Sequence, residues 1–306
     1  MASSVILPPE LEYEIFMFAL QNEVTDPGTL LLVAKRVYDW LIPHIYQTVI
    51  IHPLRIYPPD ITSASVISHG HHTRHLFVEY EAGEEDQIIE LLSHCPNISN
   101  LALWRDDSEI GQEIESIVNL DHVTGLSLDL VQFKDVDLEE DDTALKTEYQ
   151  DDPELQERLI KVKRKCLAFF SRVTHLVILA DVDQSEDVVA LKYFTSLTHL
   201  CVPASIVNQA LAYVVQTCQR LEVVVLLAAS DDEDKEILYF HKDVLEVAKG
   251  VDKEWEDLEE QVGELRGRVV PVLCRQYLAG WEKWARGGED MWTVAEKAIR
   301  GRAAKE

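Results

Sequence analysis

The sequence Val173-Thr-His-Leu176-Val-Ile178, followed by Leu197-Thr-His-Leu200-Cys-Val202, shows the pattern that decides the fold of this chain. In both stretches, apolar residues occupy the first, fourth and sixth positions of a six-residue unit. Good copies of the unit begin at five positions: Ile98, Val123, Val173, Leu197 and Leu221. Weaker copies begin at Tyr46 and Thr73. Such self-similarity is typical of a protein built from repeated structural units.

The spacing between units gives the length of the repeat. The fourth residues of successive units are separated by 25, 25, 50, 24 and 24 positions: Leu76, Leu101, Leu126, Leu176, Leu200 and Val224. Between units the apolar spacing becomes helical, as in Ile88, Leu91, Leu92 and Cys95. Each repeat is therefore predicted to be a short strand followed by a returning helix. Because one such unit cannot bury its apolar edge alone, the copies are predicted to stack with parallel strands and a shared interior.

The repeat resembles that of the leucine-rich repeat family, whose units begin with L-x-x-L-x-L and run for about 20–29 residues. The resemblance covers about residues 70–230. It implies an α/β fold, a leucine-rich-repeat-like solenoid with a parallel sheet along its concave side. The Asn or Cys that the family carries three residues after the last apolar position is replaced by Asp106, Val131, Asp181, Ser205 and Ala229. We therefore expect an irregular solenoid; the alternative is an ordinary doubly wound α/β sheet.

Residues that alternate with the core positions of each strand are predicted to face the concave side of the sheet. In the early strands they are polar or aromatic, and we predict that they bind a client protein: His75, Phe77, Glu79, Asn100, Trp104 and Asp129. In the later strands they are too apolar to form a solvent-exposed patch: Val177, Leu179, Val225 and Leu227. The Trp-rich segment 275–300 is therefore expected to cover the later strands and to leave the early concave face open.

The first 48 residues have a different pattern. Two prolines precede an amphipathic stripe that predicts a first helix: Leu11, Ile15, Phe16 and Ala19. The segment Asp26-Pro27-Gly28-Thr29 interrupts the chain, and a second helix is predicted from Leu30 to Trp40, with Pro43 ending it. Two or three short helices make only a small core, so their apolar faces need a partner or the solenoid to cover them.

The order Leu7-Pro8-x-Glu10-Leu11, then Ile15-Phe16, then Leu31 to Trp40 resembles an F-box. The continuation from Ile42 to Val49 is similar to the junction with the first repeat in fungal proteins of this type. Members of the F-box family dock a Skp-type adaptor of cullin–RING ubiquitin ligases, and their repeat domains capture the protein to be ubiquitinated. The resemblance implies an F-box-like module over residues 1–48, with these adaptor-facing residues: Leu7, Pro8, Leu11, Ile15, Phe16, Leu32 and Val33. The alternative is that the helices only cap the first repeat.

Two segments of the solenoid region, residues 49–306, differ from the repeats. The doubled spacing contains an acidic stretch, about residues 131–157, which predicts an inserted loop at the rim. From about residue 241 to 306 a helical cap is predicted, with a heptad pattern from Val244 to Leu265, a strand near Arg268 and closing helices after Trp281. We expect the heptad helix to pack on the solenoid of a monomer; dimerisation through it is the alternative.

Composition argues against several classes of function. The chain has 28 Lys and Arg against 55 Asp and Glu, and its net charge of −27 opposes binding to nucleic acid or to an anionic membrane. We find no secretory signal and no apolar run long enough to span a membrane. The five cysteines contain no C-x-x-C pair, which predicts buried, reduced thiols in the cytoplasm or nucleus. The histidines of segment 69–75, and the pair His175 and His199, lack the ligand set of a metal site.

The motifs G-x-S-x-G, H-E-x-x-H, G-x-G-x-x-G and G-x-x-x-x-G-K are absent from the sequence. These patterns together predict a non-catalytic interaction protein, with no cofactor and no metal, that bridges a Skp-type adaptor and an unidentified client. Two alternatives stay open. One is a repeat scaffold without a role in ubiquitin ligation, and the other is a small-molecule hydrolase.

Overall fold

The structure, a computed structural model, describes residues 7–21, 26–53, 55–58, 63–80, 85–105, 114–128, 152–178, 191–203, 214, 217–229, 268–274 and 277–304. The fold is α/β, and the nine strands among these residues form one open sheet in the order β2-β1-β3-β4-β5-β6-β7-β8-β9. The strands are β1 (Thr48–His52), β2 (Arg55–Tyr57), β3 (His75–Tyr80), β4 (Asn100–Arg105), β5 (Gly125–Leu128), β6 (His175–Ile178), β7 (His199–Pro203), β8 (Val223–Ala229) and β9 (Val269–Cys274). β2 pairs antiparallel with β1, and all the other pairs are parallel.

The register of the sheet follows the repeat residue by residue. The six central residues are paired in one continuous row: Leu76, Leu101, Leu126, Leu176, Leu200 and Val224. Each of them is at most 2% exposed. The predicted parallel pairing and shared interior of these six residues are therefore confirmed. Val49 and Val269 extend the row at its two ends, so the weak copy at Tyr46 and the strand predicted near Arg268 also belong to the sheet.

A second repeated feature lies at the start of each strand. The backbone carbonyl of Thr174 accepts hydrogen bonds from the N–H groups of Thr198 and His199. Five further backbone carbonyls accept the same pair of hydrogen bonds from the next repeat: Gln47, Arg74, Ser99, Thr124 and Thr198. Hydroxyl groups add to this ladder, because Thr198 Oγ1 donates to the Thr174 carbonyl and Ser99 Oγ donates to the Arg74 carbonyl, both at 3.1 Å. Each repeat is thus tied to its predecessor before the sheet hydrogen bonds begin.

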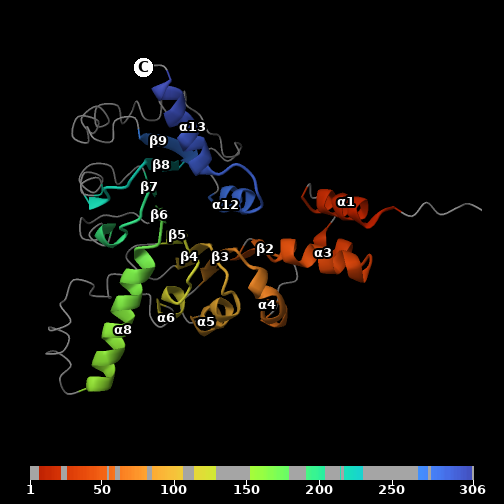
Figure 1. Ribbon diagram of the computed structural model, residues 1–306, viewed down its shortest axis with the longest axis horizontal. Coiled ribbons are helices and arrows are strands. Elements are labelled where there is room, and N and C mark those ends of the chain that lie inside the picture. Colours follow the sequence, from red (N-terminus) through yellow and green to blue (C-terminus); the bar gives the residue numbers. More distant parts are fainter. Residues whose placement is uncertain are drawn as a thin grey trace, which may run out of the picture.

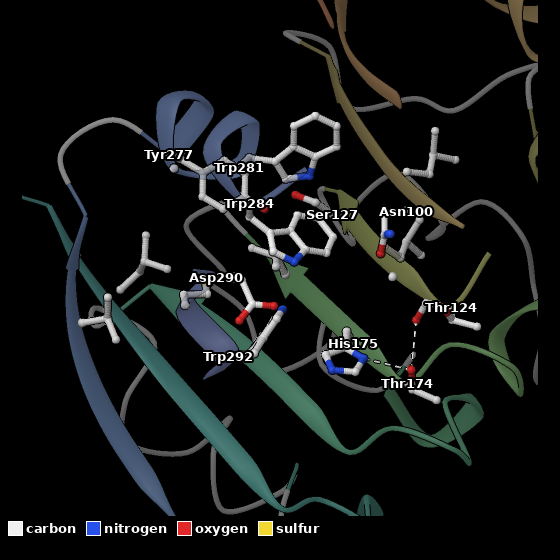
Figure 2. A pocket seen from close by; sticks show the side chains of 18 residues that line it. Asn100, Thr124, Ser127, Thr174, His175, Tyr277, Trp281, Trp284, Asp290 and Trp292 are labelled. Carbon is white, nitrogen blue, oxygen red and sulfur yellow. Dashed lines mark hydrogen bonds between the residues drawn. The ribbon is translucent and has the colours of Figure 1, made fainter. Parts of the chain in front are cut away.

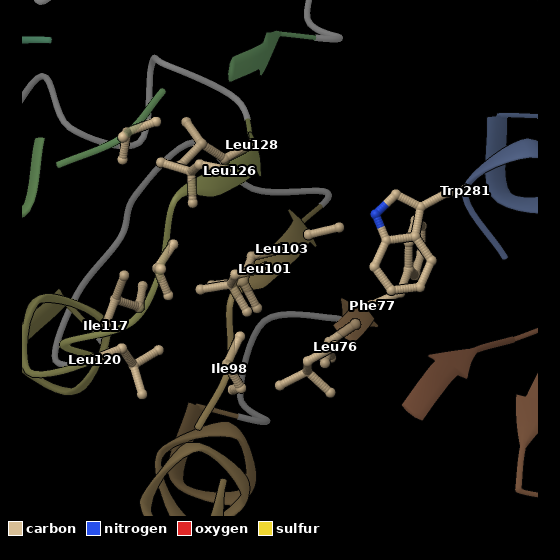
Figure 3. Packing of buried hydrophobic residues seen from close by; sticks show 14 of the residues in the cluster. Leu76, Phe77, Ile98, Leu101, Leu103, Ile117, Leu120, Leu126, Leu128 and Trp281 are labelled. Carbon is tan, nitrogen blue, oxygen red and sulfur yellow. The ribbon is translucent and has the colours of Figure 1, made fainter. Parts of the chain in front are cut away.

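Four helices lie on the outer side of the bent sheet (Figure 1): α4 (Ser63–His69), α5 (Glu85–His94), α6 (Ile114–Val118) and α8 (Pro153–Phe170). A 3₁₀ turn, η1 (Gly70–His72), follows α4. Ile117 of α6 belongs to the same large cluster of buried apolar residues as the strand residues Leu76 and Leu101 (Figure 3). We call this cluster the main core. β5 pairs directly with β6, so the doubled spacing adds no strand to the sheet between them. Residues 129–151, most of the predicted insertion, and the predicted heptad helix lie outside the described residues.

Two C-terminal helices, α12 (Tyr277–Ala285) and α13 (Met291–Ala303), lie on the inner side of the bend (Figure 1). α13 covers the late strands as expected, because Trp292 is buried in one cluster with Val177 and Val225. α12 covers the early strands: the ring centroid of Trp281 lies 5.3 Å from that of Phe77, on the side of the strands opposite the helices of the main core (Figure 3). The expectation that the early concave face stays open is therefore wrong for Phe77, which α12 covers. Burial of a large apolar ring such as Phe77 stabilises the folded protein, and α12 buries this ring.

The N-terminal segment forms three helices: α1 (Pro9–Gln21), α2 (Pro27–Leu31) and α3 (Lys35–Ile45). The predicted second helix is thus interrupted after Leu31, and Pro43 lies inside α3 and does not end it. Asp26 caps α2, because its carboxylate accepts a hydrogen bond from the Thr29 N–H at 3.0 Å. α3 buries Val37, Leu41, Ile42 and Ile45 in the main core. This burial anchors the three helices next to β1.

Candidate functional sites: an exposed apolar helix face and a tryptophan-lined cavity

The inner face of α1 holds the helix against α3. Phe16 and Leu20 pack on the main core, and the ring of Tyr13 meets Trp40 edge to face at a centroid distance of 5.8 Å. The Tyr13 hydroxyl also lies 3.1 Å from His44 Nε2. An ion pair of 2.6 Å between Arg36 and Glu12 adds a further link. These contacts fix the orientation of α1 and so determine which of its residues point away from the protein.

The outer face of α1 is apolar too. Leu11, Ile15 and Phe18 follow one another at spacings of four and three residues, so they share one side of the helix. Their exposed fractions are 46%, 53% and 64%. Every residue of α1 is described, and none of them is buried. A helix that is apolar on opposite sides is normally buried on both, so the exposed outer side of α1 is a candidate contact surface.

Exposed apolar side chains are concentrated in this part of the molecule. Seven of the nine large apolar side chains exposed among the described residues lie between residues 7 and 38. Leu32 and Val33, in the turn between α2 and α3, are 87% and 58% exposed. We call the following six residues the N-terminal apolar face: Leu7, Leu11, Ile15, Phe18, Leu32 and Val33. A group of this kind on a monomer commonly marks a contact surface.

The structure places the seven predicted adaptor-facing residues as follows. Six of them are exposed: Leu7, Pro8, Leu11, Ile15, Leu32 and Val33. Phe16 lies on the inner face of α1 and packs on the main core, so it is not part of the exposed surface. Phe18 was missed by the sequence reasoning, although its position seven residues after Leu11 places it on the same side of the helix.

The second site is a cavity of about 290 Å³ between the inner face of the sheet and the C-terminal helices (Figure 2). Its floor includes Asn100, Gly125 and His175, which are aligned on β4, β5 and β6. Its opposite wall contains one acidic and four aromatic residues: Tyr277, Trp281, Trp284, Asp290 and Trp292. We call this site the tryptophan cavity.

Gly125 leaves room for the Asn100 side chain in the lining of the tryptophan cavity. A side chain at this position would have its Cβ atom 2.1 Å from Asn100 Oδ1, which is far inside a van der Waals contact. The missing side chain thus lets the Asn100 amide lie beside β5, where its Nδ2 donates to His75 Nδ1 at 3.0 Å. Of the three paired positions Asn100, Gly125 and His175, the middle one therefore has no side chain.

Two histidines on the inner face, His75 and His175, have pKa values well below the ordinary value for histidine. Burial, together with the neighbouring His199, lowers the pKa of His175 to about 4, even though the carboxylates of Asp290 and Glu296 act in the opposite direction. Burial and the charge of Arg74 likewise lower the pKa of His75 to about 4. Both imidazoles are therefore neutral at pH 7.

His175 and His199, predicted to approach one another, are stacked at 4.2 Å between ring centroids. The ring of Trp292 lies against both of them at 5.5 Å. His199 Nε2 lies 3.2 Å from the Glu296 carboxylate, which links β7 to α13. Equivalent positions on neighbouring repeats thus build a single aromatic group under α13.

Five of the six predicted client-facing residues are described, and they lie on the inner face, where α12 covers part of them. Phe77 is fully buried beneath Trp281, so it is not on the protein surface. His75 meets the ring of Trp284 at 5.3 Å. Glu79 pairs with His52 at 2.7 Å.

Two further predicted client-facing residues, Asn100 and Trp104, line cavities on the inner face. Asn100 lines the tryptophan cavity, and Trp104 donates from Nε1 to Ser127 Oγ at 3.3 Å. Trp104 and His75 also line a larger groove of about 1130 Å³ that separates α1 and α3 from α12. Asp129 lies outside the described residues.

The described residues offer little nucleophilic or metal chemistry. Burial raises the pKa of the Cys166 thiol to about 12 and those of Cys95 and Cys218 to about 11, so these thiols stay protonated and unreactive. No cluster of three or more His, Cys, Asp or Glu side chains able to hold a metal ion occurs in the described part of the chain. Among the described helices, none combines the length and the apolar character needed to cross a bilayer.

Comparison with known proteins assigns no family: no protein-family model and no curated protein matches this sequence.

Proposed function

We propose that this chain is a non-catalytic interaction subunit, an F-box-like module followed by a leucine-rich-repeat-like solenoid. Its N-terminal helices dock a Skp-type adaptor of a cullin–RING ubiquitin ligase, and its repeat region presents a client protein. The observation that carries the proposal is the N-terminal apolar face, where Leu11, Ile15 and Phe18 are exposed on a helix whose other side is already packed. Residue types and order in this segment support the adaptor as the occupant, since they resemble the F-box pattern.

The arrangement of the helices supports the same proposal. α3 is anchored in the main core, and α1 is held on it by the Tyr13 and Arg36 contacts, so the exposed side chains sit on a fixed support. A preorganised surface binds with a smaller loss of conformational entropy than a flexible one. The client is proposed to use the groove beside α12, where His75 and Trp104 are accessible from the side of the N-terminal helices.

Capture of a purified Skp-type adaptor by the full chain tests this function. Leu11 and Ile15 are about half exposed, so truncating both to Ala removes contacts worth about 2 kcal/mol at an interface and should weaken binding about 10- to 30-fold. The matched control is Ile67→Ala, the same kind of truncation at an exposed residue of α4, and it should leave the affinity unchanged.

Two results would overturn the proposal. One is that the wild-type chain does not bind the adaptor, which would leave a scaffold role as the better account. The other is that the Leu11→Ala, Ile15→Ala variant binds as well as the Ile67→Ala control. The unfolding free energies of both variants should change by no more than about 0.5 kcal/mol per substitution, because all three side chains are exposed. A loss of binding is then not a loss of fold.

A further inference from the structure

The charged side chain among the described residues that line the tryptophan cavity is negative. Among the described residues that line it, Asp290 is the only carboxylate, and neither Lys nor Arg is present. One oxygen of Asp290 accepts a hydrogen bond from the Thr293 N–H at 2.6 Å and so caps α13. No ion pair joins Asp290 to a described side chain, so its second oxygen is not committed to a described cation.

The walls of the cavity supply aromatic surfaces next to this carboxylate. Figure 2 shows Trp284, Asp290 and Trp292 on the side of the C-terminal helices, facing His175 and Thr174 on the sheet. The faces of indole rings attract cations, and Trp does so more strongly than Tyr or Phe. An enclosure of indole rings with one carboxylate is the arrangement that recognises alkylated ammonium groups, because it offers both apolar contact and negative potential.

The remaining polar groups do not oppose a cation. His175 faces the cavity as a neutral imidazole at pH 7, since burial lowers its pKa to about 4. Arg300 of α13 is paired with Glu296 of the same helix at 3.1 Å, and Glu296 also lies 3.2 Å from His199 Nε2, so this nearby cation is balanced by a carboxylate. The net charge of −27 favours the approach of cations over anions.

We propose that the tryptophan cavity binds a methylated ammonium group, with the indoles of Trp284 and Trp292 against its methyl groups and Asp290 balancing its charge. The volume of about 290 Å³ is at the lower end for ligand pockets, which fits a head group with a short chain better than a large molecule. The same head group is carried by free quaternary amines and by trimethylated lysine side chains of proteins. The proposal is independent of adaptor docking, since it uses none of the residues of the N-terminal apolar face.

Titration calorimetry on the full chain, in about 0.15 M salt to screen long-range attraction, tests the proposal. The probes are tetramethylammonium, choline and the amide of N-acetyl-trimethyllysine. The control probe is 3,3-dimethylbutan-1-ol, which has the shape of choline without its charge. Saturable binding of the cationic probes, at least about tenfold tighter than that of the neutral alcohol, is expected. Equal or tighter binding of the alcohol would show that the cavity selects apolar shape alone and would overturn the proposal.

Two single-charge variants separate the cavity from the general acidity of the chain. Asp290→Asn removes the charge and keeps the helix cap, because Asn and Asp are equally good at that position. It should weaken binding of choline at least about tenfold, whereas Glu289→Gln, the neighbouring change outside the cavity lining, should change it less than about twofold. Equal effects of the two changes, or no saturable binding of any cation by the wild type, would refute the site.

A third variant tests the aromatic wall. Trp284→Leu, at a half-buried residue, should weaken the cationic probes and leave the weak binding of the alcohol nearly unchanged. Comparison of choline with the trimethyllysine amide then assigns the source: tighter binding of the amide indicates a modified protein segment, and tighter binding of choline indicates a free amine. Both results support the proposal. Adaptor capture by Asp290→Asn should equal that of the wild type, so failure of either proposal is seen separately.

Discussion

Acidification is expected to destabilise the protein through two partly buried histidines, His75 and His175. Each has a pKa of about 4 in the folded chain, against an ordinary value of 6.5. Below pH 6.5 the unfolded chain therefore binds protons at these two sites that the folded chain does not bind. Unfolding is favoured by this difference, so stability falls as the pH drops from 6.5 towards 4 and changes no further below that through these groups.

The size of the effect follows from the two pKa values. One histidine lowers the unfolding free energy by about 1.4 kcal/mol at about pH 5.5 and by almost nothing at about pH 7.5. The two together contribute about 2–3 kcal/mol over this interval. Both side chains are mostly shielded from solvent, so the figure needs no large reduction for screening. This loss is a sizeable fraction of the total stability of an ordinary domain.

Urea denaturation followed by tryptophan fluorescence, at about pH 7.5 and about pH 5.5, measures the effect. The variants His75→Gln and His175→Gln should each remove about 1.3 kcal/mol of the pH-dependent loss, and the double variant should remove most of it. His122→Gln, at an exposed histidine, is the matched control and should leave the pH dependence as it is. The reasoning fails if the double variant and His122→Gln lose the same free energy between the two pH values.

Four further changes probe the repeat, the cavity floor and the hold of α12. Leu176→Ala, at a fully buried position of the central row, should cost about 2–5 kcal/mol of unfolding free energy in denaturant titrations. Thr198→Val removes the hydroxyl bond to the Thr174 carbonyl and should cost about 1 kcal/mol by the same assay. Gly125→Ala should cost about 1–3 kcal/mol because its Cβ collides with Asn100, and adding Asn100→Ala should recover part of the loss in a double-mutant cycle. Glu282→Gln weakens the pairing of α12 with Arg55, whose Nε lies 2.5 Å from the carboxylate; it should increase proteolysis of the C-terminal segment, and an unchanged cleavage rate would contradict this.

The sheet was predictable from the sequence because its determinants are local and periodic. Spacings of 24 and 25 residues fix which residue of one repeat faces which residue of the next, and Leu76 through Val224 pair as expected. The Ser or Thr directly before each of the strands β4 to β7 is also visible in the sequence, as in Thr174 and Thr198. Its role in the hydroxyl ladder was not inferred, because the hydrogen bond joins residues 24 positions apart.

The inner face was only partly predictable. The late strands have apolar inner residues throughout, so their cover by α13 followed from composition. The early strands mix polar residues with Phe77 and Trp104, and the average polarity suggested an open surface. In the structure, Trp281 and Tyr277 of α12 pack on the rings of Phe77 and Trp104. These two large rings, and not the average polarity, therefore determine that α12 covers this part of the face. The tryptophan cavity itself depends on the absence of a side chain at Gly125, which no local pattern reveals.

α12 occupies a position that connects the two proposed functions. Tyr277 and Trp284 line both the tryptophan cavity and the groove beside the N-terminal helices. Thr48 Oγ1 of β1 donates to the Ala285 carbonyl at 3.2 Å, and Glu282 pairs with Arg55 of β2 and with Arg286, so the helix is tied to the same end of the sheet that supports α3. A ligand that packs against Trp284 would therefore act on one wall of the groove. Binding in the cavity and binding of a client in the groove should influence each other, because they share these two side chains.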